Sequence, residues 1–170
     1  MFDILARIYR TGFLSEAAPI AKDVAMDGLQ HNLRAVFGRA LRIRHVDAGS
    51  CNGCELEIQA LGNPYYNLEG SGVAFVASPR HADVLLVTGP VSVNMEAALR
   101  RAYEAMPEPK WVIAVGDCGA CGGIFGSSYA CPRRVADVVP VNASVVGCPP
   151  APSAILKGLL EVVARQPHRA

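Results

Sequence analysis

The sequence has no excess of charge of either sign. Its 16 Lys and Arg nearly balance its 15 Asp and Glu, and only 18% of the 170 residues are charged. No basic excess points to nucleic acid, and no acidic excess points to a solvating tail. No apolar run approaches the roughly 20 residues that a membrane-spanning helix needs. Apolar residues nevertheless make up 51% of the chain, which is enough to bury the core of one domain.

A signal-peptide pattern is also lacking, because Asp3, Arg7 and Arg10 interrupt the apolar residues at the start. We therefore expect a chain that stays in the cytoplasm, where six cysteines indicate metal ligands or redox groups before disulfides. Residues 1–28 are interpreted as an N-terminal amphipathic segment that contacts a partner or a membrane arm; the alternative is a surface helix packed on the domain. Residues 29–170 are interpreted as a single α/β iron–sulfur domain.

Short apolar strands alternate with helical segments through the rest of the chain. Such strands, continuously apolar and separated by helices, are typical of a parallel sheet covered on both faces. The pattern predicts an α/β fold of the flavodoxin-like kind, an open parallel sheet with helices on both faces. Strands are predicted over 42–46, 73–77, 84–88, 111–115 and 143–146, and helices over 29–41, 55–61, 94–106 and 153–165.

Three of these strands run directly into loops that carry cysteine and glycine. In open parallel sheets, ligands bind outside the carboxyl ends of the strands, so residues nearly 100 positions apart can face one another. Glycine allows the backbone to turn sharply and to approach an inorganic core. The pattern predicts one [4Fe–4S] cluster, which takes four thiolates. The predicted ligands are Cys51, Cys54, Cys118 and Cys148.

Two cysteines are then spare, and other readings of the six remain open. Cys121 is expected to be spare because Cys118 follows its strand directly, and Cys131 because it lies in a less patterned stretch. Zinc is an alternative, although zinc ribbons place their CxxC pairs roughly 15–20 residues apart and these pairs are much farther apart. A thioredoxin-like pair at 51–54 is another, but it leaves the later glycine-rich loops unexplained. Buried free thiols are the structural alternative.

The cysteine loops and the segments between them resemble a known family. CNGCELEI, VGDCGACGGIF and VVGCPPAPSAILKGL are similar to the small subunit of group 4, membrane-bound [NiFe] hydrogenases, which shares ancestry with the 20 kDa iron–sulfur subunit of complex I. The resemblance extends over about residues 42–160. The first two cysteines are separated by two residues, as in the hydrogenase branch, whereas the complex I subunit has adjacent cysteines. With no cysteine beyond Cys148, the chain resembles the compact, single-cluster type of formate hydrogenlyase.

The resemblance implies a function in a larger complex. Cys51, Cys54, Cys118 and Cys148 match the family's cluster ligands. The cluster would lie next to the Ni–Fe site of a partner large subunit and exchange electrons with a ferredoxin-like iron–sulfur subunit. Integral membrane subunits would hold the chain peripherally on the cytoplasmic side of the inner membrane.

An oxidoreductase subunit of the complex I type, passing electrons to quinone, is the alternative function. A zinc- or disulfide-stabilised interaction module is a more distant one. The resemblance also implies a proton path or an interface at Glu57, whereas Glu55 and Glu57 could simply favour the positive end of a helix dipole. Arg80 and His81 follow the second predicted strand and are expected at the cluster end of the sheet or in a solvated loop.

Overall fold

The computed structural model describes residues 40–164, together with Ala6, Tyr9 and Arg10. The predicted amphipathic segment over 1–28 lies outside the described residues except for those three. The helix expected over 29–41 also lies outside them except for its last two positions, 40 and 41. Residue 165, the last of the predicted closing helix, also lies outside them. No helix among the described residues is both long and apolar enough to cross a membrane.

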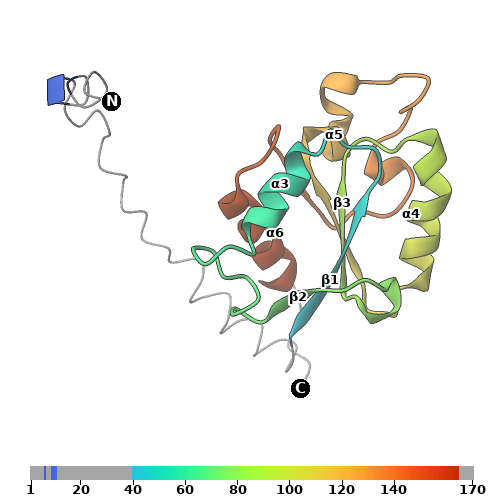
Figure 1. The fold of residues 1–170 in the computed structure, drawn as a ribbon. Helices are drawn as coiled ribbons and strands as arrows, with labels where there is room; N and C mark the ends of the chain where they lie inside the picture. The colour runs from blue at the N-terminus through green and yellow to red at the C-terminus, as the bar shows by residue number, and fades with distance from the viewer. Residues whose placement is uncertain (1–5, 7–8, 11–39, 165–170) are drawn as a thin grey trace.

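A five-stranded parallel sheet forms the centre of the described domain (Figure 1). Its strand order is β2-β1-β3-β4-β5, the order of flavodoxin-like sheets, and every adjacent pair is parallel. This confirms the predicted fold class. The strands are β1 (Leu41–Asp47), β2 (Val73–Phe75), β3 (Val84–Thr88), β4 (Trp111–Val115) and β5 (Ala143–Val145).

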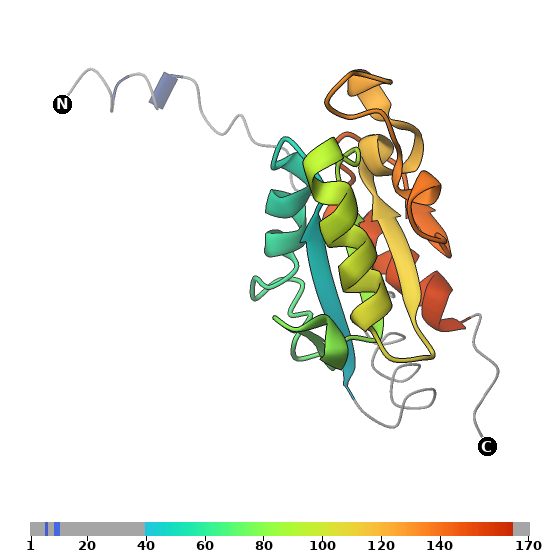
Figure 2. The same ribbon diagram turned by 90° about the vertical axis from the view of Figure 1, so that its right-hand side faces the viewer.

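Helices cover both faces of the sheet and give it two apolar layers. On one face, α3 (Gly53–Ala60) and α6 (Pro152–Ala164) pack on one cluster of buried residues. On the other, α4 (Val93–Ala105) packs on a second cluster, and Figure 2 shows it lying in front of the sheet. The two central strands, β3 and β4, are buried along their whole length, which explains their continuously apolar sequences.

The connections place the cysteine-bearing segments at one end of the sheet. The start of α3 and the short helix α5 (Gly116–Cys121) both lie at the carboxyl ends of the strands (Figure 1). Cys118 was expected in a loop, but α5 begins directly after β4 and includes it. Gly116 makes this sharp entry possible, because its φ of 85° lies in the left-handed region that glycine tolerates.

Arg80 and His81 lie at the opposite end of the sheet, so placing them at the cluster end was wrong. They belong to the short 3-10 helix η1 (Pro79–His81), which leads into the first residue of β3. That residue pairs with Trp111, the first residue of β4. The connection from β2 therefore returns to the amino ends of the central strands before β3 begins.

Candidate metal centre

Four cysteine side chains from three separate connections line one small cavity. Cys51 and Cys54 come from the β1–α3 connection and the first turn of α3, Cys118 from α5, and Cys148 from the loop after β5. These four residues share a cavity because the parallel sheet brings the ends of β1, β4 and β5 together. The other residues around the cavity are small or turn-forming: Ser50, Gly53, Gly89, Asp117, Gly147 and Pro149.

Glycine at several positions leaves space for the sulfur atoms. A Cβ at Gly116 would lie 2.7 Å from Cys54 Sγ, and a Cβ at Gly123 would lie 2.8 Å from Cys118 Sγ. Both glycines also have positive φ, 85° and 54°. Any larger residue at these positions would collide with the thiol of Cys54 or Cys118, so the glycines fit the close approach expected around an inorganic core.

The thiols of the cavity influence one another electrostatically. The pKa of Cys54 is raised to about 12, mainly by burial and in addition by nearby Glu55 and the thiols of Cys118, Cys51 and Cys148. Burial also raises the pKa of Cys118, with contributions from Cys148 and Cys51. Ionisation of Cys54 and Cys118 is therefore unfavourable unless a positive charge compensates for it. Bound iron would supply that charge, since a coordinating thiol is deprotonated by its metal.

The arrangement fits a cluster better than a single ion. Among residues 40–164 and the three described near the N-terminus, no group of three or more His, Cys, Asp or Glu lies close enough to hold one metal ion. A single tetrahedral zinc with Zn–S bonds of about 2.3 Å would draw its thiolates almost into contact. In a [4Fe–4S] cluster each thiolate binds a different iron, so four sulfurs spaced around a cavity fit that donor set.

The two remaining cysteines lie outside this cavity. Cys121, the last residue of α5, is exposed and donates its thiol to the backbone oxygen of Asp117 at 3.2 Å. Cys131 is half-buried, and its backbone N–H donates to Ser128 Oγ at 3.0 Å. Neither side chain lines the cavity that the other four share.

A buried polar group next to the cysteines was not anticipated. Glu55 follows Cys54 and is only 8% exposed, and neither carboxylate oxygen has a hydrogen-bond partner. Its Oε1 lies 3.7 Å from His45 Nε2, which is also 3.0 Å from Thr88 Oγ1. Burial lowers the pKa of His45, although Glu55 and Asp47 oppose that shift. Glu57, the carboxylate that the resemblance pointed to, is half-buried on the same helix.

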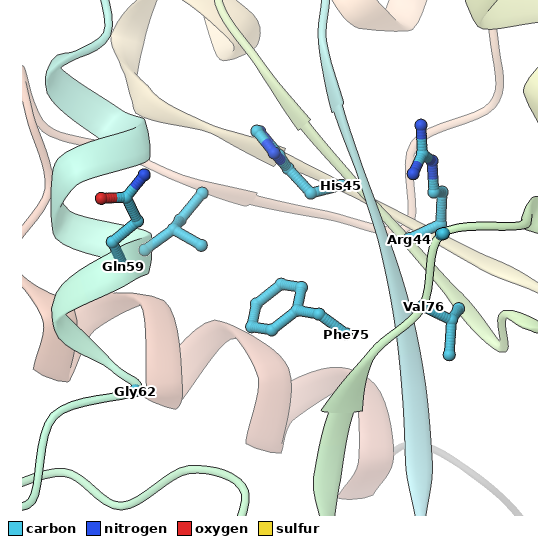
Figure 3. Close-up of a pocket in the computed structure, with 8 residues that line it drawn as sticks. Arg44, His45, Gln59, Gly62, Phe75 and Val76 are labelled. Carbon is cyan, nitrogen blue, oxygen red and sulfur yellow. The ribbon is translucent and has the colours of Figure 1, made fainter.

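His45 also lines a larger cavity of about 420 Å³ beside α3. In Figure 3, His45, Gln59 and Phe75 point into the space between β1, α3 and β2, whereas Arg44 points to the other side of β1. No cysteine lines this cavity. Despite its smaller size, the cysteine cavity is the better candidate for the metal centre because it holds the only set of soft, metal-binding donors in the described residues.

Asp117 is a further residue whose role the sequence did not reveal. Its sequence position predicted only a turn residue, yet its Oδ1 accepts a hydrogen bond from the Gly147 N–H at 2.7 Å, and its own N–H donates to the Gly147 oxygen at 3.0 Å. The two residues are distant in sequence, and only the pairing of β4 with β5 brings them together.

Comparison with known sequences identifies the family. The family model described as NADH ubiquinone oxidoreductase, 20 Kd subunit, matches residues 51–162. The chain is 46% identical over 124 residues to the probable membrane-bound hydrogenase subunit mbhJ of Pyrococcus furiosus, covering 73% of this chain and 74% of that protein. It is 40% identical over 140 residues to formate hydrogenlyase subunit 7 of Escherichia coli, covering 82% of this chain and 55% of that protein.

Solved structures agree with this result. A chain of the membrane-bound sulfane sulfur reductase, an archaeal respiratory membrane complex, matches with a TM-score of 0.66 and 30% identity over 80% of this chain and 74% of that one. A chain of an NAD+-reducing [NiFe]-hydrogenase matches with a TM-score of 0.60 over 78% of this chain and 96% of that one, and at 18% identity it supports the fold alone. The chain belongs to the family of the complex I 20 kDa subunit and the [NiFe] hydrogenase small subunit, and it is a subunit of an oxidoreductase complex.

Proposed function

We propose that the chain carries one [4Fe–4S] cluster on Cys51, Cys54, Cys118 and Cys148 and acts as an electron-transfer subunit. The observation that carries this proposal is the convergence of these four thiols, from three strand ends, on one cavity. When bound, the cluster supplies one-electron redox chemistry. The chain's own part is to hold four thiolates, to keep larger side chains out of the glycine-lined cavity, and to set the electrostatic environment of the cluster.

We propose the hydrogenase branch of the family for this chain. The relatives at 46% and 40% identity are named as subunits of a membrane-bound hydrogenase and of formate hydrogenlyase. Cys51 and Cys54 are separated by two residues, which is the pattern of that branch rather than the adjacent pair of the complex I subunit. In this proposal the cluster is proximal to a Ni–Fe site on a large subunit, in a membrane-bound hydrogen-evolving complex.

The surface around the cavity suits a buried contact with such a large subunit. Leu56, Ile124 and Val146, all close in sequence to a proposed ligand, are 57%, 82% and 70% exposed. We propose that these three side chains contribute to that contact, because apolar residues are concentrated in the buried core of a protein interface. We further propose a ferredoxin-like iron–sulfur subunit as electron partner. Integral membrane subunits would hold the chain peripherally on the cytoplasmic side of the inner membrane.

A complex I-type function with quinone as electron acceptor is the second candidate. The matching family model is described as a subunit of NADH ubiquinone oxidoreductase, which supports this second candidate. The deciding evidence lies in the neighbouring large-subunit sequence, because a nickel site requires its two CxxC ligand pairs. A large subunit without those pairs would refute the hydrogenase proposal and leave the electron-transfer role in place.

Serine substitutions test the ligand assignment directly. Each of the variants Cys51→Ser, Cys54→Ser, Cys118→Ser and Cys148→Ser, purified anaerobically, should contain less iron and sulfide than the natural chain, which should hold about four of each. Cys121→Ser is the matched control, because Cys121 is also on α5 but outside the cavity. Stoichiometric zinc in the natural chain, or loss of iron in the control, would refute the assignment.

Glu57 is proposed to contribute to a proton path or to the interface near the metal centre. It directly follows Leu56 on α3 and is half-buried, so it can remain in contact with water or a partner. Glu57→Gln should slow hydrogen evolution by the assembled complex, whereas a variant with the full rate would exclude the role.

A further inference from the structure

Asp117 joins the two connections that carry the third and fourth proposed ligands. It immediately precedes Cys118, and its partner Gly147 immediately precedes Cys148. Its carboxylate oxygen accepts from the Gly147 N–H at 2.7 Å, and its N–H donates to the Gly147 oxygen at 3.0 Å. The pair of hydrogen bonds closes a ring between the two residues, one step away from each sulfur ligand.

This ring continues the register of the sheet beyond the point where the sheet ends. The paired residues of β4 and β5, such as Val115 and Val145, are 30 positions apart in the sequence. Asp117 and Gly147 are separated by the same number of residues, and so are Cys118 and Cys148. The two hydrogen bonds between Asp117 and Gly147 therefore extend the alignment of the two strands to the two proposed ligands.

The backbones of Asp117 and Gly147 share one hydrogen bond at this point, and the Asp117 side chain supplies the second. Gly116 has a φ of 85° and starts α5, while Gly147 has a φ of 137° and starts the turn into Cys148. The chain thus leaves the strand conformation directly after Val115 of β4 and within two residues of Val145 of β5. β5 is an edge strand of three residues, and Val146 and Cys148 beside it are exposed. The Asp117 carboxylate supplies an anchor for this loop that the sheet does not provide.

We propose that Asp117 is a positioning residue that fixes Cys118 and Cys148 relative to one another for cluster binding. The inference rests on the proposed function, since it assumes that these cysteines hold a cluster. The carboxylate has a second effect that an amide would lack. Its negative charge is carried by the residue directly before Cys118, and a negative charge so close to a bound cluster favours the oxidised state and lowers the reduction potential.

Two substitutions separate the hydrogen bond from the charge. Asp117→Asn retains an oxygen that can accept from the Gly147 N–H but removes the negative charge. Asp117→Ala removes both and leaves the backbone N–H without its acceptor. The matched control is Asp137→Ala, because Asp137 also accepts from a backbone N–H, that of Arg134 at 3.1 Å, but does not line the cavity.

The experiment uses the full-length chain, purified anaerobically and reconstituted with ferrous iron and sulfide. Asp117→Ala should hold less than half the iron of the natural chain, and its reduced cluster should give a broadened EPR spectrum. Asp117→Asn should keep the natural iron content and line shape, with a more positive midpoint potential in a dye-mediated titration. Asp137→Ala should match the natural chain in all three measurements.

Natural iron content and an unchanged spectrum in Asp117→Ala would overturn the proposal. An Asp117→Asn variant as defective as the alanine variant would also overturn it, because the retained acceptor would then have no value. If Asp117→Ala does not fold, the spectrum and potential of Asp117→Asn still decide. Absence of an iron–sulfur cluster from the natural chain would instead refute the proposed function, so the two failures are distinguishable.

Discussion

Gly116 allows the cysteine cavity to be tested with a single methyl group. A Cβ at this position would lie 2.7 Å from Cys54 Sγ. Nonbonded heavy atoms approach favourably only to about 3.5–4.0 Å, so the added methyl would overlap the sulfur by roughly 1 Å. Cys54 is buried and fixed in the first turn of α3, so its sulfur cannot move aside freely. Gly116→Ala should therefore displace a proposed ligand as well as strain the backbone.

Gly72 offers a control with the same strain and no contact. Its φ of 87° nearly equals the 85° of Gly116, but a Cβ there would meet no atom within 4 Å. A left-handed conformation costs a residue other than glycine roughly 1–2 kcal/mol. Each kcal/mol lowers Tm by about 2–4 °C in a chain of this size. We therefore expect Gly72→Ala to lower Tm by about 2–8 °C and to leave the cluster in place.

The assay compares iron and sulfide per chain in the two variants after anaerobic purification, with Tm measured in parallel. Gly116→Ala should lose at least half of its iron, while Gly72→Ala should retain the natural content. Natural iron content and an unaltered EPR spectrum in Gly116→Ala would show that the space beside Cys54 Sγ is not needed for ligation. Equal iron loss in both variants would show that backbone strain, rather than the contact with sulfur, limits cluster binding.

Three further predictions concern individual side chains. In the cluster-free chain at pH 8, the pKa of about 12 should make Cys54 react with iodoacetamide about a thousandfold more slowly than a thiol with the ordinary pKa of 9.0. The rate should rise toward pH 12, and rapid labelling detected by mass spectrometry at pH 8 would contradict this prediction. Burial lowers the pKa of His45, so the unfolded chain binds a proton at this residue more readily than the folded chain, and the cluster-free chain should lose stability as pH falls through 6.5. The free energy of unfolding from urea titrations should fall less steeply with pH in His45→Gln, and an unchanged pH dependence would count against this reasoning. Ile124→Asp, at an 82% exposed position, should weaken association with the large subunit roughly 5- to 30-fold in a pull-down titration without lowering iron content, and undiminished association would remove Ile124 from the interface.

The polar group around Glu55 shows how tertiary contacts change the meaning of a residue. Its position after Cys54 predicts a carboxylate at the start of a helix, and Glu55 does lie in the first turn of α3. The structure adds that both of its oxygens are buried without hydrogen bonds, beside His45 and next to a proposed ligand. Sequence periodicity could not show this, because the burial of Glu55 depends on how α3 packs on β1.

The sequence by itself determined the central strands and the cysteine-bearing connections. The strands predicted over 84–88 and 111–115 have the observed bounds of β3 and β4, since a strand buried on both faces must be continuously apolar and each run ends at glycine. The parallel sheet then places the ends of β1, β4 and β5 together, which was enough to predict that cysteines 51, 54, 118 and 148 share a cavity. These features follow from local pattern and from the geometry of parallel sheets.

The tertiary structure alone decided how those cysteines are held. The hydrogen bonds of Asp117 with Gly147 depend on the register of β4 against β5, and the positive φ of Gly116 is set by the immediate start of α5. The glycine at 116 signals a turn but does not fix its φ, and the contact of Asp117 with Gly147 has no signature in the sequence, because contacts between residues 30 positions apart are fixed by the packing of the whole sheet. Local pattern therefore predicts which residues reach the site, while strand register and backbone conformation determine the geometry in which they meet.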